Sequence, residues 1–181
     1  MRTIATLVVV SALAGCAAMS PEECEFADWQ ALGELDARQG RAYDHLARRG
    51  KACNEAGFAV DSAAYRAGWD HGITYFCQPD QGFAEGLNGH AYARICPTEY
   101  EPGFLEGYGV GIEIYRARTA RDAVDAKIRV LEAELADPLN LTDTQIREHE
   151  RELDRARDEV RRLEREVGIL EGRAATLGYR P

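Results

Sequence analysis

Apolar side chains recur at alternating steps of four and three residues through the C-terminal part of the chain, and this pattern constrains the fold more than any other feature. The first stripe lies at Val110, Ile114, Ala117, Val124, Ile128, Leu131 and Leu135. The second stripe lies at Ile146, His149, Leu153, Ala156, Val160, Leu163, Val167, Leu170, Ala174 and Leu177. Their mean period, about 3.5 residues, is typical of a coiled-coil seam. We therefore expect helix from about Glu101 onward.

A proline-containing break over residues 137–141 separates the two stripes. Thr142 and Gln145 follow the break with the spacing of a capping box, in which each side chain accepts a hydrogen bond from the other residue's backbone amide. Two apolar stripes joined by a short loop predict an antiparallel helical hairpin over residues 116–181, with a second helix about 50 Å long. The hairpin either closes on itself or self-associates with that of another chain, and it is a candidate contact for a protein partner.

Two polar residues, Arg121 and His149, interrupt the seam. We expect both to lie near its edge, where long or amphipathic side chains reach water. The alternative is that they fix the register of the two helices or make the hairpin sensitive to pH.

Five cysteines occur in the chain, and four of them, Cys24, Cys53, Cys77 and Cys96, follow Cys16. Their even number, without the Cys-x-x-Cys spacing of zinc or redox sites, predicts two structural disulfides in an oxidising compartment. We call residues 26–115 the head. Three of the four cysteines lie in the head, and Cys24 lies just before it. The head is thus the part of the chain that depends on covalent cross-links.

The order of expected helices narrows the disulfide pairing. If Asp61 caps a helix that runs to Cys77, then Cys53 lies beside its start, about 20 Å from Cys77. A bridge between Cys53 and Cys77 is therefore disfavoured. A chain reversal earlier in the head would return Cys24 to Cys53, so we expect the pairs Cys24–Cys53 and Cys77–Cys96.

Aromatic and glycine residues recur together in three parts of the head, at residues 65–75, 83–92 and 104–115. In the first and third of these units the spacing places the aromatics and glycines on one helical face. A glycine inside a helix costs about 1 kcal/mol relative to alanine, so close approach of another backbone is the expected reason for it. Turn-forming residues surround the middle unit, which we expect to be an irregular loop closed by Cys77 and Cys96.

The N-terminus has the pattern of a bacterial lipoprotein signal peptide over residues 1–15. Arg2 precedes an apolar run that is too short to span a bilayer, and small residues lead to Cys16. We expect cleavage before Cys16, lipidation of Cys16, and a short tether over residues 16–25. Neither residue 17 nor residue 18 is the aspartate that tends to retain such proteins at the inner membrane, which favours the outer membrane, facing the periplasm.

Charge divides the chain unevenly. Residues 17–115 hold 7 basic and 16 acidic side chains, whereas residues 116–181 hold 14 and 15. An acidic head makes nucleic acid a poor partner. The alternating signs of the C-terminal part predict a solvated helical surface with ion pairs that each contribute only tenths of a kcal/mol.

A resemblance to a known family rests on the order of aromatic, glycine and cysteine residues through the head. The positions that carry it are Asp28, Trp29, Gly33, Asp36, Gly40, Cys53, Asp61, Tyr65, Gly68, Gly72, Tyr75, Cys77, Gly82, Phe83, Gly86, Gly89, Tyr92, Cys96, Pro97 and Phe104. They resemble the proteobacterial lipoprotein family called domain of unknown function 2799, over roughly residues 20 to 135. The resemblance implies fold and location but no activity. Ala37 stands where the family tends to have glycine, so a turn at that position is not expected to carry over.

No established catalytic, metal-binding or cofactor motif occurs in the sequence. We expect no enzymatic activity, no metal and no cofactor, and we interpret the protein as an interaction or structural module of the cell envelope. The alternative is a module that binds peptidoglycan or another glycan, with Trp29, Trp69, Asp70 and His71 as candidate binding residues. A weaker hypothesis is a hydrolase centred on Asp70 and His71, with His45, Asp61, Glu85 and His90 as the other titratable candidates.

Overall fold

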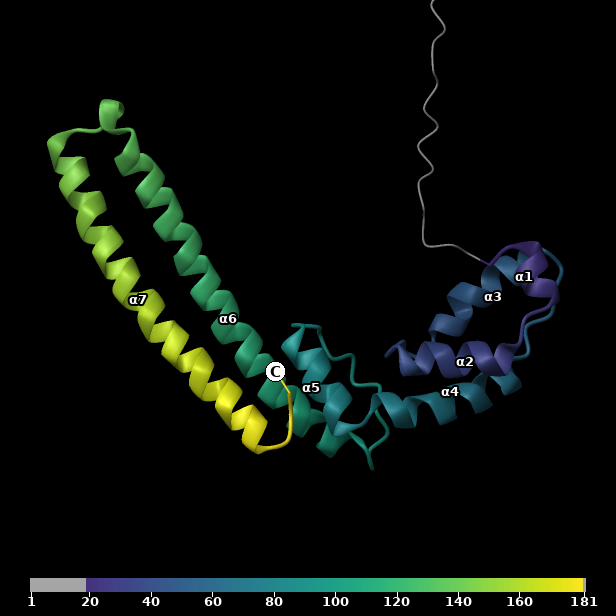
Figure 1. Cartoon of the computed structure of the whole chain (residues 1–181). Coiled ribbons are helices and arrows are strands. Elements are labelled where there is room, and N and C mark those ends of the chain that lie inside the picture. The colour runs from purple at the N-terminus through teal and green to yellow at the C-terminus, as the bar shows by residue number, and fades with distance from the viewer. Residues whose placement is uncertain (1–18, 181) are drawn as a thin grey trace, which may run out of the picture.

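The computed structural model describes residues 19–180, and all of the regular secondary structure in them is helical (Figure 1). The helices are α1 (Pro21–Glu25), α2 (Trp29–Arg38), α3 (His45–Glu55), α4 (Ser62–Phe76), α5 (Pro79–Leu87), α6 (Glu101–Ala136) and α7 (Asp143–Thr176), with a 3-10 turn at Pro138–Asn140. This confirms a mainly helical fold with a long C-terminal hairpin. The predicted signal peptide and Cys16 lie outside the described residues.

Local sequence signals set most helix starts. Asp28 and Asp61 cap α2 and α4 by accepting hydrogen bonds from the backbone amides three residues on. The predicted capping box of Thr142 and Gln145 is formed at the start of α7, with Thr142 N–H donating to Gln145 Oε1 at 2.9 Å. The cap at Asp61 and the helix that follows it to Phe76 were expected from the sequence.

The head consists of two pairs of parallel helices. In the first pair α2 lies along α4, and in the second pair α5 lies along the first four turns of α6. Figure 1 shows the pairs in a row, with α1 and α3 beside the first. A return connection joins the helices of each pair: it contains α3 in the first pair and is a loop over residues 88–100 in the second.

Glycines allow both pairs to pack backbone against backbone. A Cβ built on Gly68 would lie 3.0 Å from the backbone nitrogen of Glu34, and one on Gly107 would lie 2.9 Å from that of Phe83. Both would come closer still to a carbonyl oxygen of the facing helix. The predicted reason for the helical glycines is thereby confirmed. The first half of the middle unit, residues 83–87, belongs to the helix α5 instead of the expected loop, because Pro79 starts a helix well and Gly82 and Gly86 face α6. The rest of the unit, residues 88–92, lies in a loop as expected, with Gly89 at a positive φ.

The two pairs are copies of one structural unit. Contacts of the first pair recur in the second. Corresponding residues of α2 and α5 differ in residue number by one constant value, and corresponding residues of α4 and α6 differ by a smaller constant value. Trp69 Nε1 donates to the carbonyl of Arg41, and Tyr108 Oη donates to that of His90, each at 2.9 Å. The corresponding residues include Gly33 and Gly82, Gly40 and Gly89, Tyr43 and Tyr92, Tyr65 and Phe104, Gly68 and Gly107, and Gly72 and Gly111.

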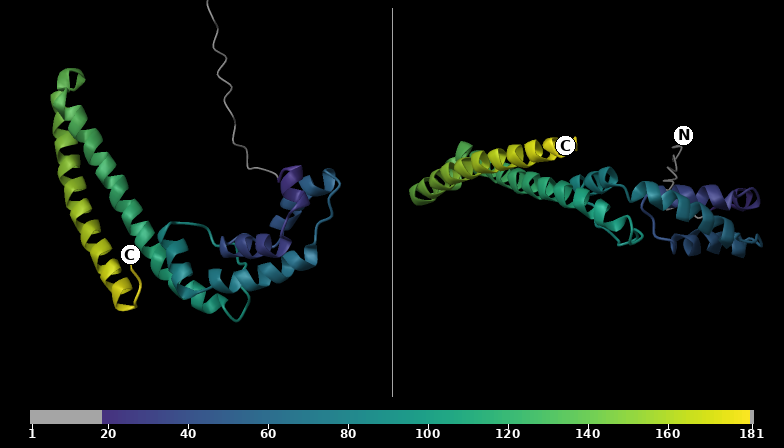
Figure 2. Two further views of the ribbon diagram at one scale, coloured as in Figure 1. Left: turned by 45° about the vertical axis from the view of Figure 1, so that its right-hand side comes forward. Right: turned by 90° about the horizontal axis from the view of Figure 1, so that it is seen from below.

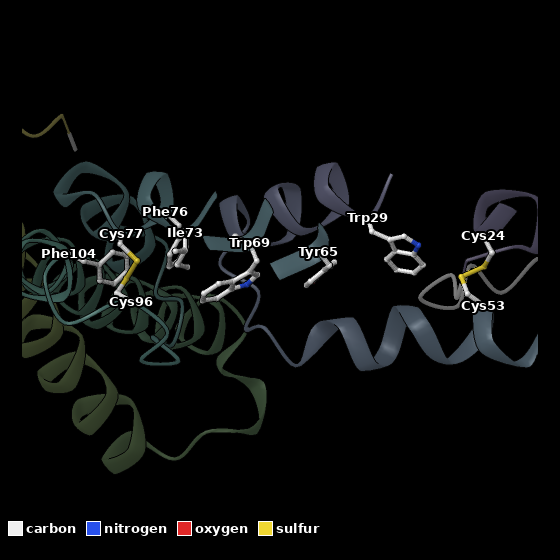
Figure 3. Close-up of a cluster of buried hydrophobic side chains, with 11 residues drawn as sticks. Cys24, Trp29, Cys53, Tyr65, Trp69, Ile73, Phe76, Cys77, Cys96 and Phe104 are labelled. Carbon is white, nitrogen blue, oxygen red and sulfur yellow. A yellow bond between two sulfur atoms is a disulfide. The ribbon is translucent and has the colours of Figure 1, made fainter. Parts of the chain in front are cut away.

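Both predicted disulfides are present. Cys24 bonds Cys53 and Cys77 bonds Cys96, so each bridge joins the entry of one helix pair to its return connection. Figure 3 shows them at opposite ends of a row of buried side chains that includes Trp29, Trp69 and Phe104. Disulfides of this kind indicate an extracytoplasmic protein.

The C-terminal hairpin extends away from the head as an arm, formed by α7 and by α6 from about residue 116 onward (Figure 2). Its seam buries several positions of the predicted apolar stripes, and Leu131, Leu153 and Leu163 are 5 to 7% exposed. Leu177, the last position of the second stripe, lies at the C-cap of α7 and is 51% exposed. The boundary expected at residue 116 falls inside α6, which runs unbroken from the head into the arm. Among the described helices, none is both long and apolar enough to cross a membrane.

Arg121 and His149 differ in how they fit the seam. Arg121 lies at its edge, as predicted, and its guanidinium bonds the carboxylate of Asp122. The His149 ring is 23% exposed, and its Nδ1 is buried without a hydrogen-bond partner although Glu134 Oε2 lies 3.4 Å away. The structure thus places Arg121 as expected and His149 deeper than expected.

Candidate functional site

The one buried charged side chain in residues 19–180 is Asp36 on α2, which no sequence pattern identified as a site residue. Arg49 on α3 donates to both of its carboxylate oxygens, at 2.6 and 2.7 Å, and Tyr65 on α4 donates to Oδ2 at 2.8 Å. Arg41 lies 3.5 Å from Oδ1. These bonds attach α3 to the first helix pair.

The surroundings of Asp36 keep it ionised. Burial alone would raise the pKa of this carboxyl, but the hydrogen bonds from Arg49 and Tyr65 outweigh burial and lower it below its usual range. Burial and the bond to Asp36 raise the pKa of Tyr65, which therefore stays neutral. A carboxylate whose oxygens are engaged in this way is a poor proton acceptor, so the cluster is suited to holding helices together and not to catalysis.

A second polar cluster lies on the solvent face of the first pair and includes His71, one of the predicted site residues. Glu34 pairs with Arg38 at 2.7 Å and with His71 Nδ1 at 3.3 Å. The Arg38 guanidinium lies 3.9 Å from the centre of the Tyr75 ring, which the His71 ring meets edge-on. The hydrogen bond from His71 lowers the pKa of Glu34. We call these four residues the polar face.

The second pair has apolar residues at the four corresponding positions: Phe83, Leu87, Val110 and Ile114. This surface packs against Leu170 and Ala174 of α7 and against Tyr179, whose ring stacks on Phe83 with 4.7 Å between centroids. Because α6 runs from the second pair into the arm, α7 returns along α6 to this pair, where its apolar residues cover the surface. On the first pair the same surface is charged and remains exposed.

Two of the predicted binding residues are core residues. Trp29 is 6% exposed and Trp69 is 8% exposed, and the Trp69 N–H is taken by the carbonyl of Arg41. Figure 3 shows both indoles inside the row of core side chains. They therefore do not form the sugar-stacking surface on which the glycan hypothesis depended.

The remaining titratable candidates do not converge. Asp70 is exposed and lies 3.9 Å from Arg66, whereas His71 turns to Glu34. His90 pairs with Glu85 at 3.0 Å in the second helix pair, and Asp61 serves as a helix cap. Over the part of the chain that the structure describes, no group of three His, Cys, Asp or Glu side chains could hold a metal ion.

The arm offers a large, regular surface with charged edges. Ion pairs join its two helices, among them Lys127–Glu152 at 2.5 Å and Arg157–Glu132 at 2.8 Å. Alanines in the seam leave a groove of about 340 Å³ that Ala117, Ala120 and Leu163 help to line. Large apolar side chains are exposed on the arm: Val130 on α6 is 56% exposed, and Leu139 at the tip is 89% exposed.

The sequence comparison with protein families matches residues 28–113 to the family described as a protein of unknown function, DUF2799. This segment, from the cap of α2 into the fourth turn of α6, is therefore a DUF2799 domain, and it contains both helix pairs. Neither the curated proteins nor the solved structures include a match to the chain.

Proposed function

We propose that this protein is a lipid-anchored lipoprotein of the cell envelope, held at the outer membrane through Cys16 and facing the periplasm, where its arm contacts another protein. The observation that carries the proposal is the arm itself. Two helices of 36 and 34 residues continue beyond the head and contact only each other over most of that length.

Several features support an interaction role for the arm and none requires catalysis. The docking of α7 on the second helix pair holds the base of the arm, so its direction relative to the head is set. The exposed Leu139 at the tip is the kind of apolar side chain that protein partners cover, and the charged edges would select among partners by electrostatic complementarity. The sequence from Arg2 to Cys16 supports the anchor.

Site-specific photo-crosslinking in the cell tests the arm. A photoreactive amino acid at Leu139 or Val130 should form adducts with one partner protein, because both side chains point to solvent on the arm. The same probe at Asp70, which is exposed on the head, is the matched control and should form none. Adducts at Asp70 alone, or none at any position, would contradict the proposal for the arm.

The same experiment separates a partner from self-association. If the adduct at Leu139 has twice the mass of the chain, the arms of two copies contact each other. Adducts of a different mass identify another protein. Intact-mass measurement tests the anchor independently: the mature chain should begin at Cys16 and carry acyl mass, and a Cys16→Ser variant should carry none.

A further inference from the structure

An apolar groove of about 400 Å³ lies at the N-terminal end of the head. Its lining includes Met19 and Phe26, which precede α2 in the chain, and Ala31, Leu32 and Leu35 of α2. Phe26 is 81% exposed and Leu35 is 46% exposed, so two large apolar side chains face water at its rim. The groove takes no part in the docking of the arm, which lies on the second helix pair.

From this groove and its place in the chain, we propose that it is the surface by which the head rests on the phospholipid bilayer, with Phe26 and Leu35 in contact with lipid. The inference rests on the proposed anchor at Cys16. Met19, which lines the groove, follows Cys16 by three residues, and three extended residues span at most about 11 Å. A lipid on Cys16 therefore places the groove next to the membrane.

The anchor also makes a weak surface contact effective. A tethered head meets the bilayer at a high effective concentration, so binding needs little intrinsic affinity. Phe and Leu side chains at an interface gain by leaving water for the acyl region. Two such side chains are too few to bind a free protein to a membrane, but they are enough to orient a protein that is already anchored there.

Charge around the groove determines which bilayer it fits. Glu23 and Asp28 line the groove, and Glu22 and Glu25 lie on α1 with Glu23. Arg49, the one basic residue in the lining, is paired with Asp36. An acidic rim is repelled by anionic headgroups and tolerated by zwitterionic ones. The contact is therefore apolar in origin and should weaken as the fraction of anionic lipid rises.

Quenching of tryptophan fluorescence by brominated acyl chains tests the contact. The acylated mature protein is reconstituted into zwitterionic phosphatidylcholine vesicles in three variants, Phe26→Trp, Glu55→Trp and Leu139→Trp. Glu55 is exposed on α3, two residues after Cys53, and is thus a near control outside the groove; Leu139 at the tip of the arm is the distant control. Trp29 and Trp69 give the same background in all three variants.

We expect brominated lipid to lower the emission of the added tryptophan about twofold at position 26 and to leave it nearly unchanged at positions 55 and 139. Equal quenching at 26 and 55 would mean that the head is merely near the bilayer and would overturn the proposal. Unquenched emission at 26 that depends on protein concentration would assign the groove to a second copy instead, which also overturns it. Intact mass is measured on the same samples: acylated protein without quenching refutes only the groove contact, whereas protein without acyl mass refutes the anchor and the groove contact together.

Discussion

Replacing Gly107 by alanine should destabilise the protein, whereas the same change at Gly109, two residues later on α6, should stabilise it. The two sites differ in what a Cβ would meet. At Gly109 nothing lies within 4 Å, but at Gly107 the new carbon would lie 2.9 Å from the backbone nitrogen of Phe83 and closer to the carbonyl oxygen of Pro79. Neither backbone atom can rotate away, so α5 and α6 would have to separate.

The magnitudes follow from two opposing effects. Alanine is preferred over glycine inside a helix by about 1 kcal/mol, and Gly109→Ala should gain that amount, which raises the Tm of a chain of this size by about 2–4 °C. Gly107→Ala has the same gain, but overpacking costs about 3 kcal/mol where the neighbours are rigid. The net loss is then about 2 kcal/mol, a Tm lower by about 4–8 °C.

Thermal and urea unfolding, followed by circular dichroism at 222 nm with the disulfides intact, measure both variants. Gly68→Ala provides an internal repeat of the experiment, because Gly68 occupies the position in the first helix pair that Gly107 occupies in the second. If Gly107→Ala were as stable as Gly109→Ala, the backbone contact between α5 and α6 would not exist as described, and the equivalence of the two helix pairs would lose its main support.

Two further predictions concern the arm and the buried carboxylate. Leu163→Asp should lower the free energy of unfolding by about 3 kcal/mol or more and reduce the helix signal, because it places a charge in the seam, whereas Glu164→Asp on the exposed side should change stability little; a tolerated Leu163→Asp would contradict the seam. Asp36→Asn should cost about 3 kcal/mol at pH 7 because Arg49 loses its counterion. Since the pKa of Asp36 is lower in the folded state, its contribution to the free energy of unfolding is present above about pH 4 and is lost as the pH falls through the folded pKa. The urea midpoints of wild type and Asp36→Asn should therefore converge toward about pH 2. A difference between the midpoints that stays constant with pH would show that Asp36 is not the titrating group.

Local and periodic features of the fold were predictable from the sequence. The seam of the arm follows from a repeat that any helix of this period would express, and the caps at Asp61 and Thr142 act within three residues of themselves. The disulfide pairs followed from the expected helix lengths. In each case the interacting residues are close in sequence or are fixed by the geometry of one regular element.

The sequence also showed why glycines lie inside helices, but not which backbones they meet. Helix α5 was missed because its glycines and proline have the composition of a loop. Only packing against α6 reveals that these glycines face a helix. A segment rich in glycine and proline can thus be either a loop or a helix packed closely on another helix, and tertiary contacts decide which of the two forms.

Tertiary structure alone decided the chemistry of the head. Asp36, Arg49 and Tyr65 are far apart in sequence and become one buried cluster only when α3 packs on the first helix pair. Trp29 and Trp69, candidate surface residues by composition, are buried in the core of the head. The arm docks on the second helix pair because α6 continues from that pair into the arm, and the four positions that α7 covers there are apolar. The corresponding four positions of the first pair are polar and stay exposed, a correspondence that only the folded structure reveals. Sequence therefore determined the elements and their covalent links through short-range physics, whereas burial and the choice of docking surface depended on which distant residues the fold brought together.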